Sequence, residues 1–196
     1  MRRRNQPDIM QHSILQDSSK LLQQEQEAQW IGEAKANPES FAKLYDCYAP
    51  NIYRYLLSRL GNVAGAQDVT SQTFLRAFEM LPRYRHMGYF SAWLFAIARS
   101  KYVDYLRKTK NHPETIPDSV KDPQDDLLHE VIRSERLVEL KVIIHKLPEE
   151  EQELLRLRFV AGLSFSEMAS LLERNEDAVK KTLYRLLARL QNQLEE

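Results

Sequence analysis

The sequence contains few of the residues from which catalytic, metal and disulfide sites are built. Its single cysteine, Cys47, excludes an intramolecular disulfide and a cysteine-rich zinc site and suits a reducing compartment. We interpret Cys47 as a small buried apolar side chain. The five histidines are scattered without His-x-x-x-His spacing, and no glycine-rich phosphate loop occurs. The sequence therefore predicts no catalytic residue, no bound metal and no cofactor.

Long apolar runs and strand patterns are missing as well. No apolar stretch approaches the roughly 20 residues that span a bilayer. The three arginines at positions 2–4 are followed by polar residues, which is unlike a secretory signal. We expect a cytoplasmic protein without membrane insertion. Only five glycines are available for turns and no sustained polar/apolar alternation occurs, so the sequence predicts an all-α fold.

Composition divides the 196 residues into four segments. We predict a mobile N-terminal tail over 1–24, a helical domain over 25–110, a flexible linker over 111–126 and a second helical domain over 127–196. The linker is predicted from its three prolines and five acids, a composition that cannot bury a core. The expected architecture is two small helical domains joined by an acidic tether.

Prolines and glycines indicate where helices begin and end. Pro38 is expected near a helix start, and Pro50 and Gly61 near breaks. Pro148 suits a first helical turn and Gly162 a helix end. Between the first breaks, an i, i+3, i+4, i+7 stripe indicates a buried helix face; its members are Phe41, Leu44, Tyr45 and Tyr48.

Positive and negative charges are equal in number but unevenly placed. Because the formal net charge is zero, nucleic-acid binding cannot be argued from the total. Residues 83–110 hold seven cations against one acid, whereas residues 111–126 hold five acids against one lysine. The basic segment precedes the acidic one directly, so a local cationic surface is predicted in the first domain.

Residues 164–190 have the pattern of a helix, a tight turn and a second helix. Ser164 and Glu167 have capping-box spacing, which starts the first helix near Ser164. The second helix has an apolar stripe formed by Val179, Leu183, Leu186 and Leu190. Its other face carries the cations Lys180, Lys181, Arg185 and Arg189, with Tyr184 among them. A lone basic amphipathic helix would be unremarkable, but the capped helix and short turn before it predict a helix-turn-helix.

Aromatic and cationic residues alternate over 82–110, a pattern typical of surfaces that bind phosphates and stack unpaired bases. Some of the apolar positions repeat at helical spacing and are assigned to the core: Phe90, Trp93, Leu94 and Ile97. The remaining candidates for single-strand binding are Tyr84, Arg85, His86, Tyr89, Arg99, Ser100, Lys101 and Tyr102. Together with the helix-turn-helix, they suggest two separate contacts with DNA.

Over about residues 28–194 the chain resembles bacterial RNA polymerase sigma factors of the extracytoplasmic-function group. In the first domain the resemblance is carried by PESFAKLYDCYAPNIYRYL, AQDVTSQTFLRAFEMLPRYR and FSAWLFAIARSKYVDYLRK. In the second it is carried by LPEEEQELLRLRFVAGLSFSEMASLL and AVKKTLYRLLARL. The fragments occur in the family's order, with the acidic linker between them.

The resemblance implies a non-enzymatic initiation factor whose partners are core RNA polymerase, promoter DNA and an anti-sigma factor. The expected polymerase-binding residues are Asp68, Val69, Gln72, Phe74 and Arg76. The expected contacts with the opened −10 element are Tyr84, Arg85, His86, Tyr89, Arg99, Ser100 and Lys101. The expected contacts with the −35 element are Lys180, Lys181, Tyr184 and Arg185. The linker would occupy the polymerase's RNA path.

The sequence departs from the family pattern at three places. Glu173 stands where the helix-turn-helix turn usually has a glycine. A non-glycine residue forced to positive φ would cost about 1 kcal/mol, so a slightly different turn is expected. Glu176 and Asp177 place acids at the start of the recognition helix. Ser71 and Gln72 replace a usual Gln-Glu pair in the polymerase-binding helix.

Two alternative functions remain open from the sequence. The first is a freestanding helix-turn-helix regulator whose N-terminal domain senses a signal or dimerises. The second is a DNA-acting enzyme. A simple repressor needs no single-strand surface, so the aromatic and basic segment favours the sigma factor. Co-purification with core polymerase would support that reading, whereas a two-fold dimer that binds a palindrome would support the regulator.

Overall fold

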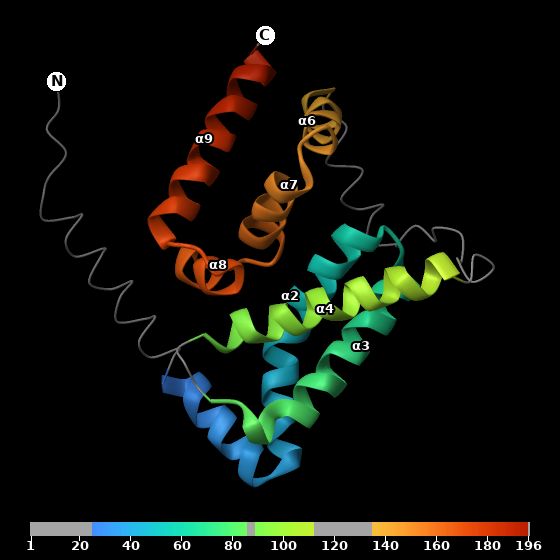
Figure 1. The fold of residues 1–196 in the computed structure, drawn as a ribbon, viewed down its shortest axis with the longest axis vertical. Helices are drawn as coiled ribbons and strands as arrows, with labels where there is room; N and C mark the ends of the chain where they lie inside the picture. Colours follow the sequence, from blue (N-terminus) through green and yellow to red (C-terminus); the bar gives the residue numbers. More distant parts are fainter. Residues whose placement is uncertain (1–24, 86–88, 112–134, 196) are drawn as a thin grey trace, which may run out of the picture.

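The computed structural model describes residues 25–85, 89–111 and 135–195, and every regular element in these ranges is a helix (Figure 1). After a first helix at residues 25–36, the elements are η1 (Pro38–Ser40), α2 (Phe41–Leu60), α3 (Val63–Met80), η2 (Leu81–Arg83), α4 (Phe90–Asn111), α6 (Glu135–His145), α7 (Glu149–Leu155), the π-helical η4 (Arg156–Val160), α8 (Phe165–Leu172) and α9 (Glu176–Glu195). The all-α prediction is confirmed. The predicted tail, and the predicted linker beyond the last residue of α4, lie outside the described residues.

The N-terminal part, residues 25–111, is built around α2, α3 and α4. Gly61 ends α2 at φ 68°, in the left-handed region that favours glycine. Asn62 then caps α3, because its Oδ1 accepts the Gly65 N–H at 2.6 Å. A Cβ on Gly65 would lie 2.8 Å from the Tyr105 hydroxyl, so only glycine allows α4 to approach α3 this closely.

The expected break at Pro50 is wrong, because α2 continues through this residue from Phe41 to Leu60. A proline inside a helix removes one backbone hydrogen bond and costs about 3 kcal/mol. Leu44, Ile52 and Leu56 of the same helix are fully buried, and this packing on both sides of the proline holds the helix together. The expectation for Pro38 is confirmed, since it is the first residue of η1.

Cys47 is exposed, which corrects the expectation that it is buried. It lies on α2 but outside the buried stripe, which contains Leu44, Ile52, Tyr55 and Leu56. Of the sequence-predicted stripe, Leu44 is buried, Phe41 and Tyr48 pack partly buried against the core, and Tyr45 is 44% exposed.

The C-terminal part, residues 135–195, contains the predicted helix-turn-helix, formed by α8 and α9. The capping box is confirmed: the Glu167 N–H donates to Ser164 Oγ at 3.2 Å, and the Ser164 N–H donates to Glu167 Oε2 at 2.6 Å. Glu173 ends α8 at φ 52° and ψ 42°, so the turn keeps the left-handed conformation that favours glycine, and the expected change of turn is wrong. The predicted apolar stripe of α9 is buried.

The ends of the preceding helices follow the sequence closely. Pro148 is the residue directly before α7 rather than a member of its first turn. Three glutamates fill that first turn, where acids complement the helix dipole. Gly162 has φ 75° just after η4, so the predicted helix end is confirmed.

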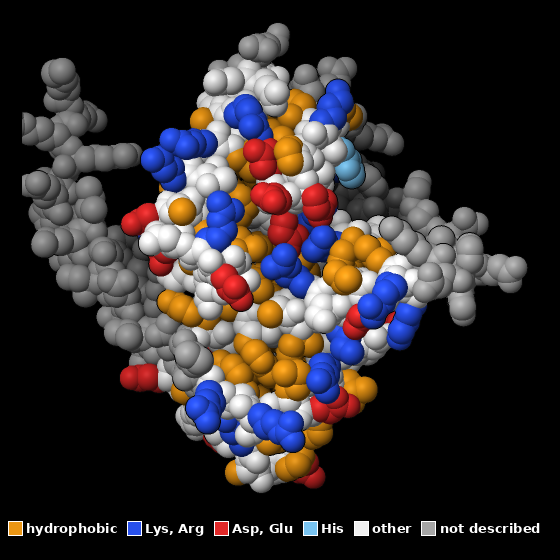
Figure 2. Space-filling model, viewed as in Figure 1, with side chains coloured by type: hydrophobic (Ala, Val, Ile, Leu, Met, Phe, Trp, Pro, Cys, Tyr) orange, Lys and Arg blue, Asp and Glu red, His pale blue; other side chains and the backbone are white. Residues whose placement is uncertain are grey.

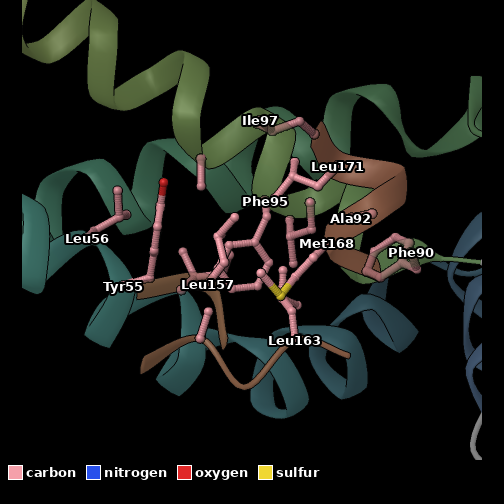
Figure 3. Packing of buried hydrophobic residues seen from close by; sticks show 14 of the residues in the cluster. Tyr55, Leu56, Phe90, Ala92, Phe95, Ile97, Leu157, Leu163, Met168 and Leu171 are labelled. Atoms are coloured by element: carbon pink, nitrogen blue, oxygen red, sulfur yellow. The ribbon is translucent and has the colours of Figure 1, made fainter. Parts of the chain in front are cut away.

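The N-terminal and C-terminal parts share one hydrophobic core. Figure 3 shows Tyr55 and Phe95 of the N-terminal part beside Leu157, Leu163 and Met168 of the C-terminal part. All five side chains are at most 3% exposed. Helix α4 therefore packs on α3 with one face and on α8 with another, which decides which of its residues stay open to solvent.

Candidate nucleic-acid and polymerase interfaces

The outer face of α9 brings together all four residues expected to contact the −35 element. Lys181 and Arg185 are exposed, and Tyr184 is 60% exposed with its ring centroid 5.8 Å from that of Phe165 on α8. Val179 and Leu183 on the opposite face of α9 are buried in the core, so Lys181 and Arg185 point toward solvent. The arrangement suits insertion of α9 into a major groove.

One of these cations is engaged within the protein. Lys180 Nζ lies 2.7 Å from Glu176 Oε1, and the hydrogen bond to Glu176 raises the pKa of Lys180. Glu176 also accepts a hydrogen bond from Ser166 Oγ at 2.7 Å. Within the described residues no ion pair joins Lys181 or Arg185 to an acid, so their charges are available for phosphates or base edges.

A groove of about 610 Å³ lies between α3 and α4 and includes two residues expected at the −10 element, Ser100 and Lys101. Its other lining residues are Arg76, Glu79, Met80, Trp93, Ala96, Ile97 and Asp104. We call it the α3–α4 groove. Figure 2 shows a hydrophobic area between these helices with Lys and Arg side chains at its edge. The charged lining residues are two cations, Arg76 and Lys101, and two acids, Glu79 and Asp104, and Arg76 pairs with Glu79 at 3.0 Å. The apolar floor is suited to stacking the bases of a single DNA strand, and Lys101 can neutralise a phosphate.

One groove residue, Trp93, is not predicted from the sequence, because its spacing places it in the core stripe. Phe90, Leu94 and Ile97 are buried as predicted, but Trp93 is only partly buried and lines the groove. A second periodicity carried the signal, since Trp93, Ala96 and Ser100 repeat at i, i+3, i+7 on another face of α4.

Arg99 does not join Ser100 and Lys101. Its Nε lies 3.5 Å from Glu153 Oε1 of α7, in the C-terminal part. Glu153 is 6% exposed and also accepts a hydrogen bond from Tyr55 Oη at 2.7 Å. Arg59 NH1 lies 3.3 Å from Glu153 Oε2. In Figure 2 the acidic side chains gather over α7, with cations next to them toward α4. Arg99 thus belongs to an ion cluster between the two parts.

The loop that precedes α4 differs from the expectation at one position. Tyr84 is only 9% exposed, with its ring centroid 5.4 Å from that of Phe90 and 4.6 Å from that of Trp93. Its ring is therefore part of the core and is no open stacking surface, which corrects the sequence interpretation. Arg85 is exposed, Tyr89 is half-buried, and His86 lies outside the described residues.

The expected polymerase-binding residues of α3 divide into an exposed and a buried set. Asp68 and Arg76 are exposed, and half-buried Gln72 donates a hydrogen bond to Asp68 Oδ2 at 2.9 Å. The other two expected residues, Val69 at 0% exposure and Phe74 at 4%, are core residues, which corrects their assignment to a contact surface. Two apolar side chains that the sequence analysis did not select, Leu75 and Phe78, are 62% and 40% exposed.

Comparison with known proteins gives the family. Residues 44–112 match sigma-70 region 2, and residues 137–190 match sigma-70 region 4. The chain is 30% identical over 153 residues to the ECF RNA polymerase sigma factor SigM of Bacillus subtilis, which covers 76% of this chain and 91% of SigM. The chain belongs to the extracytoplasmic-function sigma factors. It is also 34% identical over 182 residues to BldN of Streptomyces coelicolor; the match covers 89% of this chain and 66% of BldN.

A solved structure of another sigma factor has a similar fold. It is the sigma factor RpoE in complex with the anti-sigma factor NepR from Bartonella quintana, with a TM-score of 0.57 and 20% identity over 80% of this chain and 98% of RpoE. None of the described helices of the present sigma factor combines the length and apolar character that a membrane span requires. No group of three His, Cys, Asp or Glu side chains in the described residues is arranged to hold a metal ion.

Proposed function

We propose that this sigma factor reads the −35 element with α9 and holds the opened −10 strand in the α3–α4 groove. The chain supplies recognition and strand capture, and core RNA polymerase performs the chemistry. The observation that carries the proposal is the position of Lys181, Tyr184 and Arg185 on the open face of a capped helix-turn-helix. The exposed apolar and charged face of α3, with Asp68, Leu75 and Arg76, is the surface proposed to bind polymerase.

The two DNA surfaces cannot be used together while the two parts are docked. Promoter elements centred about 25 base pairs apart are separated by roughly 85 Å at 3.4 Å per base pair. A compact chain of about 150 residues has a radius of gyration of roughly 15 Å, and therefore a diameter near 40 Å. The parts must separate for simultaneous contact, so we propose that the docked arrangement is the form of the free protein.

Separation explains why the protein would depend on polymerase. The free chain offers DNA one small basic surface at a time, which predicts weak binding to promoter duplex alone. Core polymerase would hold the two parts apart, so that both contacts with DNA form in one complex and strengthen each other. The protein would act in the cytoplasm with the polymerase, and an anti-sigma factor is an expected partner. Nanomolar binding of the purified chain alone to a palindromic duplex would instead support a freestanding regulator.

Promoter-specific transcription with core polymerase tests the proposal, first for the wild-type chain and then for Lys181→Ala and Arg185→Ala. Loss of a side chain that reaches a base edge costs about 1 to 3 kcal/mol and relaxes the preference for that base. Arg189→Ala is the matched control, because Arg189 is on the same helix but forms an ion pair with Glu151.

Arg189→Ala should leave promoter preference unchanged. If all three substitutions weakened every promoter sequence equally, α9 would contact only the phosphate backbone, and sequence reading by this helix would be refuted. Absence of any polymerase-dependent transcription from a promoter library with the wild-type chain would refute the function as a whole.

A further inference from the structure

The first helix, residues 25–36, contacts both ends of the loop between η2 and α4. At the beginning of the loop, Lys35 Nζ donates a hydrogen bond to the Tyr84 carbonyl oxygen, and it also lies 5.8 Å from the centroid of the Tyr84 ring. At the end of the loop, Glu27 Oε1 accepts the Phe90 N–H at 3.3 Å. The helix precedes residues 44–112, which carry the match to sigma-70 region 2.

Glu27 is itself fixed by a neighbouring helix. Its second carboxylate oxygen, Oε2, accepts a hydrogen bond from Tyr48 Oη of α2. Burial of the phenol raises the pKa of Tyr48, and the hydrogen bond to Glu27 raises it further, so Tyr48 remains a donor. Glu27 therefore ties α2 to the first residue of α4, where a negative charge also complements the helix dipole.

We propose that Glu27 and Lys35 are positioning residues for capture of the −10 strand, an inference that rests on the proposed function. They fix residues 84 and 90, the described residues on either side of the start of α4. Tyr84 and Phe90 are the residues they hold, and both rings pack on Trp93, which lines the groove. Side chains that are held in place beside the groove before a strand binds lose less conformational entropy when it binds.

The contacts also predict how conservative substitutions behave. Both groups that approach Glu27 are hydrogen-bond donors, so Glu27→Gln turns an amide N–H₂ toward one of them and loses that contact. Lys35→Met removes the donor to the Tyr84 carbonyl and keeps an apolar chain of similar length, whereas Lys35→Arg retains a donor.

The same helix provides a matched control. Glu33 forms an ion pair with Lys43 Nζ at 2.7 Å, and this contact does not involve the loop. Glu33→Gln thus removes the same charge from the same helix as Glu27→Gln. Differences between the two variants report the loop contact and not the net charge or the stability of the helix.

The first measurement uses the protein alone. Trp30 and Trp93 are its two tryptophans, so in a Trp30→Phe background Trp93 is the only indole and reports the packing beside the loop. We expect stronger acrylamide quenching of Trp93 in Glu27→Gln and Lys35→Met than in Glu33→Gln or Lys35→Arg. Unchanged quenching in Glu27→Gln and Lys35→Met would refute the positioning role of these two residues without bearing on the proposed function.

The second measurement uses core polymerase and permanganate footprinting of the −10 thymines on two templates. On a matched promoter, Glu27→Gln and Lys35→Met should reduce open complex about tenfold, the factor expected for one hydrogen bond to a charged group. A template mismatched over the −10 segment should recover part of this loss, because unpairing no longer depends on strand capture.

The Glu33→Gln and Lys35→Arg variants should open the matched promoter as well as the parent protein does. Equal opening by all variants would overturn the positioning role, and so would equal losses on both templates, which would indicate a general folding defect. If the parent protein opened neither template, the proposed function would fail and this inference with it.

Discussion

Glu153→Gln tests whether the ion cluster between the two parts controls access to polymerase. The substitution keeps the shape of the side chain and removes its charge. Glu153 lies at 2.7 Å from Tyr55 Oη, 3.3 Å from Arg59 NH1 and 3.5 Å from Arg99 Nε. Arg156, the fourth neighbour, approaches only to 4.0 Å. All but Arg156 belong to the N-terminal part, so most of the lost interaction is interaction between the parts.

The magnitude follows from the burial of these groups. Removal of one partner of a buried ion pair costs about 3 to 5 kcal/mol. Two features reduce this figure: the side chain of Arg99 is 38% exposed and can return to water, and Arg59 keeps a contact with Glu149 at 2.8 Å. We therefore expect a loss of about 2 kcal/mol, or roughly a 30-fold weaker docking equilibrium.

Glu153→Gln should lower the stability of the protein but raise its affinity for polymerase. The free energy of unfolding, from urea titration followed by circular dichroism, should fall by about 2 kcal/mol. Affinity for core polymerase, from fluorescence anisotropy of the labelled sigma factor, should rise by up to about 30-fold, because a ligand that requires the separated form binds more tightly when that form is more populated. A merely destabilised protein would lose affinity or keep it.

Glu151→Gln is the control, since Glu151 pairs with Arg189 inside the C-terminal part. It should change the unfolding free energy by less than about 1 kcal/mol and leave polymerase affinity unchanged. If Glu153→Gln bound polymerase no better than this control while unfolding more easily, the docked arrangement would not compete with polymerase, and the reasoning would be refuted.

Two further predictions concern single residues. Glu173→Gly should raise the unfolding free energy by about 1 kcal/mol and the melting temperature by roughly 2 to 4 °C, because φ 52° is strained for glutamate but not for glycine; calorimetry that finds no increase would contradict this. Cys47 should react with iodoacetamide in the native protein more slowly than free cysteine at pH 8. Although the residue is exposed, neighbouring protein atoms desolvate its thiolate and the charge of Glu27 repels it, which raises its pKa and reduces the thiolate fraction. The rate should increase as pH rises, and Glu27→Gln should accelerate it at fixed pH.

Local signals in the sequence predicted the C-terminal part well. Ser164 and Glu167 satisfy each other's backbone groups without help from distant residues, so their spacing alone defined the start of α8. The stripe of α9 was equally readable, because Val179 and Leu183 repeat with the helical period and have one core to face. Contacts between residues that are close together in the chain could therefore be predicted from the sequence.

Errors arose where a second helix decides the environment. Helix α4 has two packed faces, and periodicity could not tell that Arg99 faces Glu153 while Ser100 lines the groove. Val69 and Phe74 were assigned to a contact surface from their position in the family pattern, which gives the helix but not the side of it. At Pro50, tertiary packing outweighs the intrinsic tendency of proline to break a helix, so α2 continues.

The proposed separation of the two parts breaks contacts at their boundary, and the composition of that boundary indicates that a partner has to replace them. Leu157 and Met168 are fully buried where the C-terminal part meets α2 and α4 (Figure 3). Separation returns Glu153 to water, which recovers its desolvation cost, but each apolar side chain of this size loses roughly 1.5 to 3 kcal/mol when exposed. Exposure of these apolar residues therefore disfavours the separated form in addition to the loss of the Glu153 contacts. A partner that stabilises it must cover apolar surface, whereas DNA alone, which supplies mainly phosphates, cannot do so.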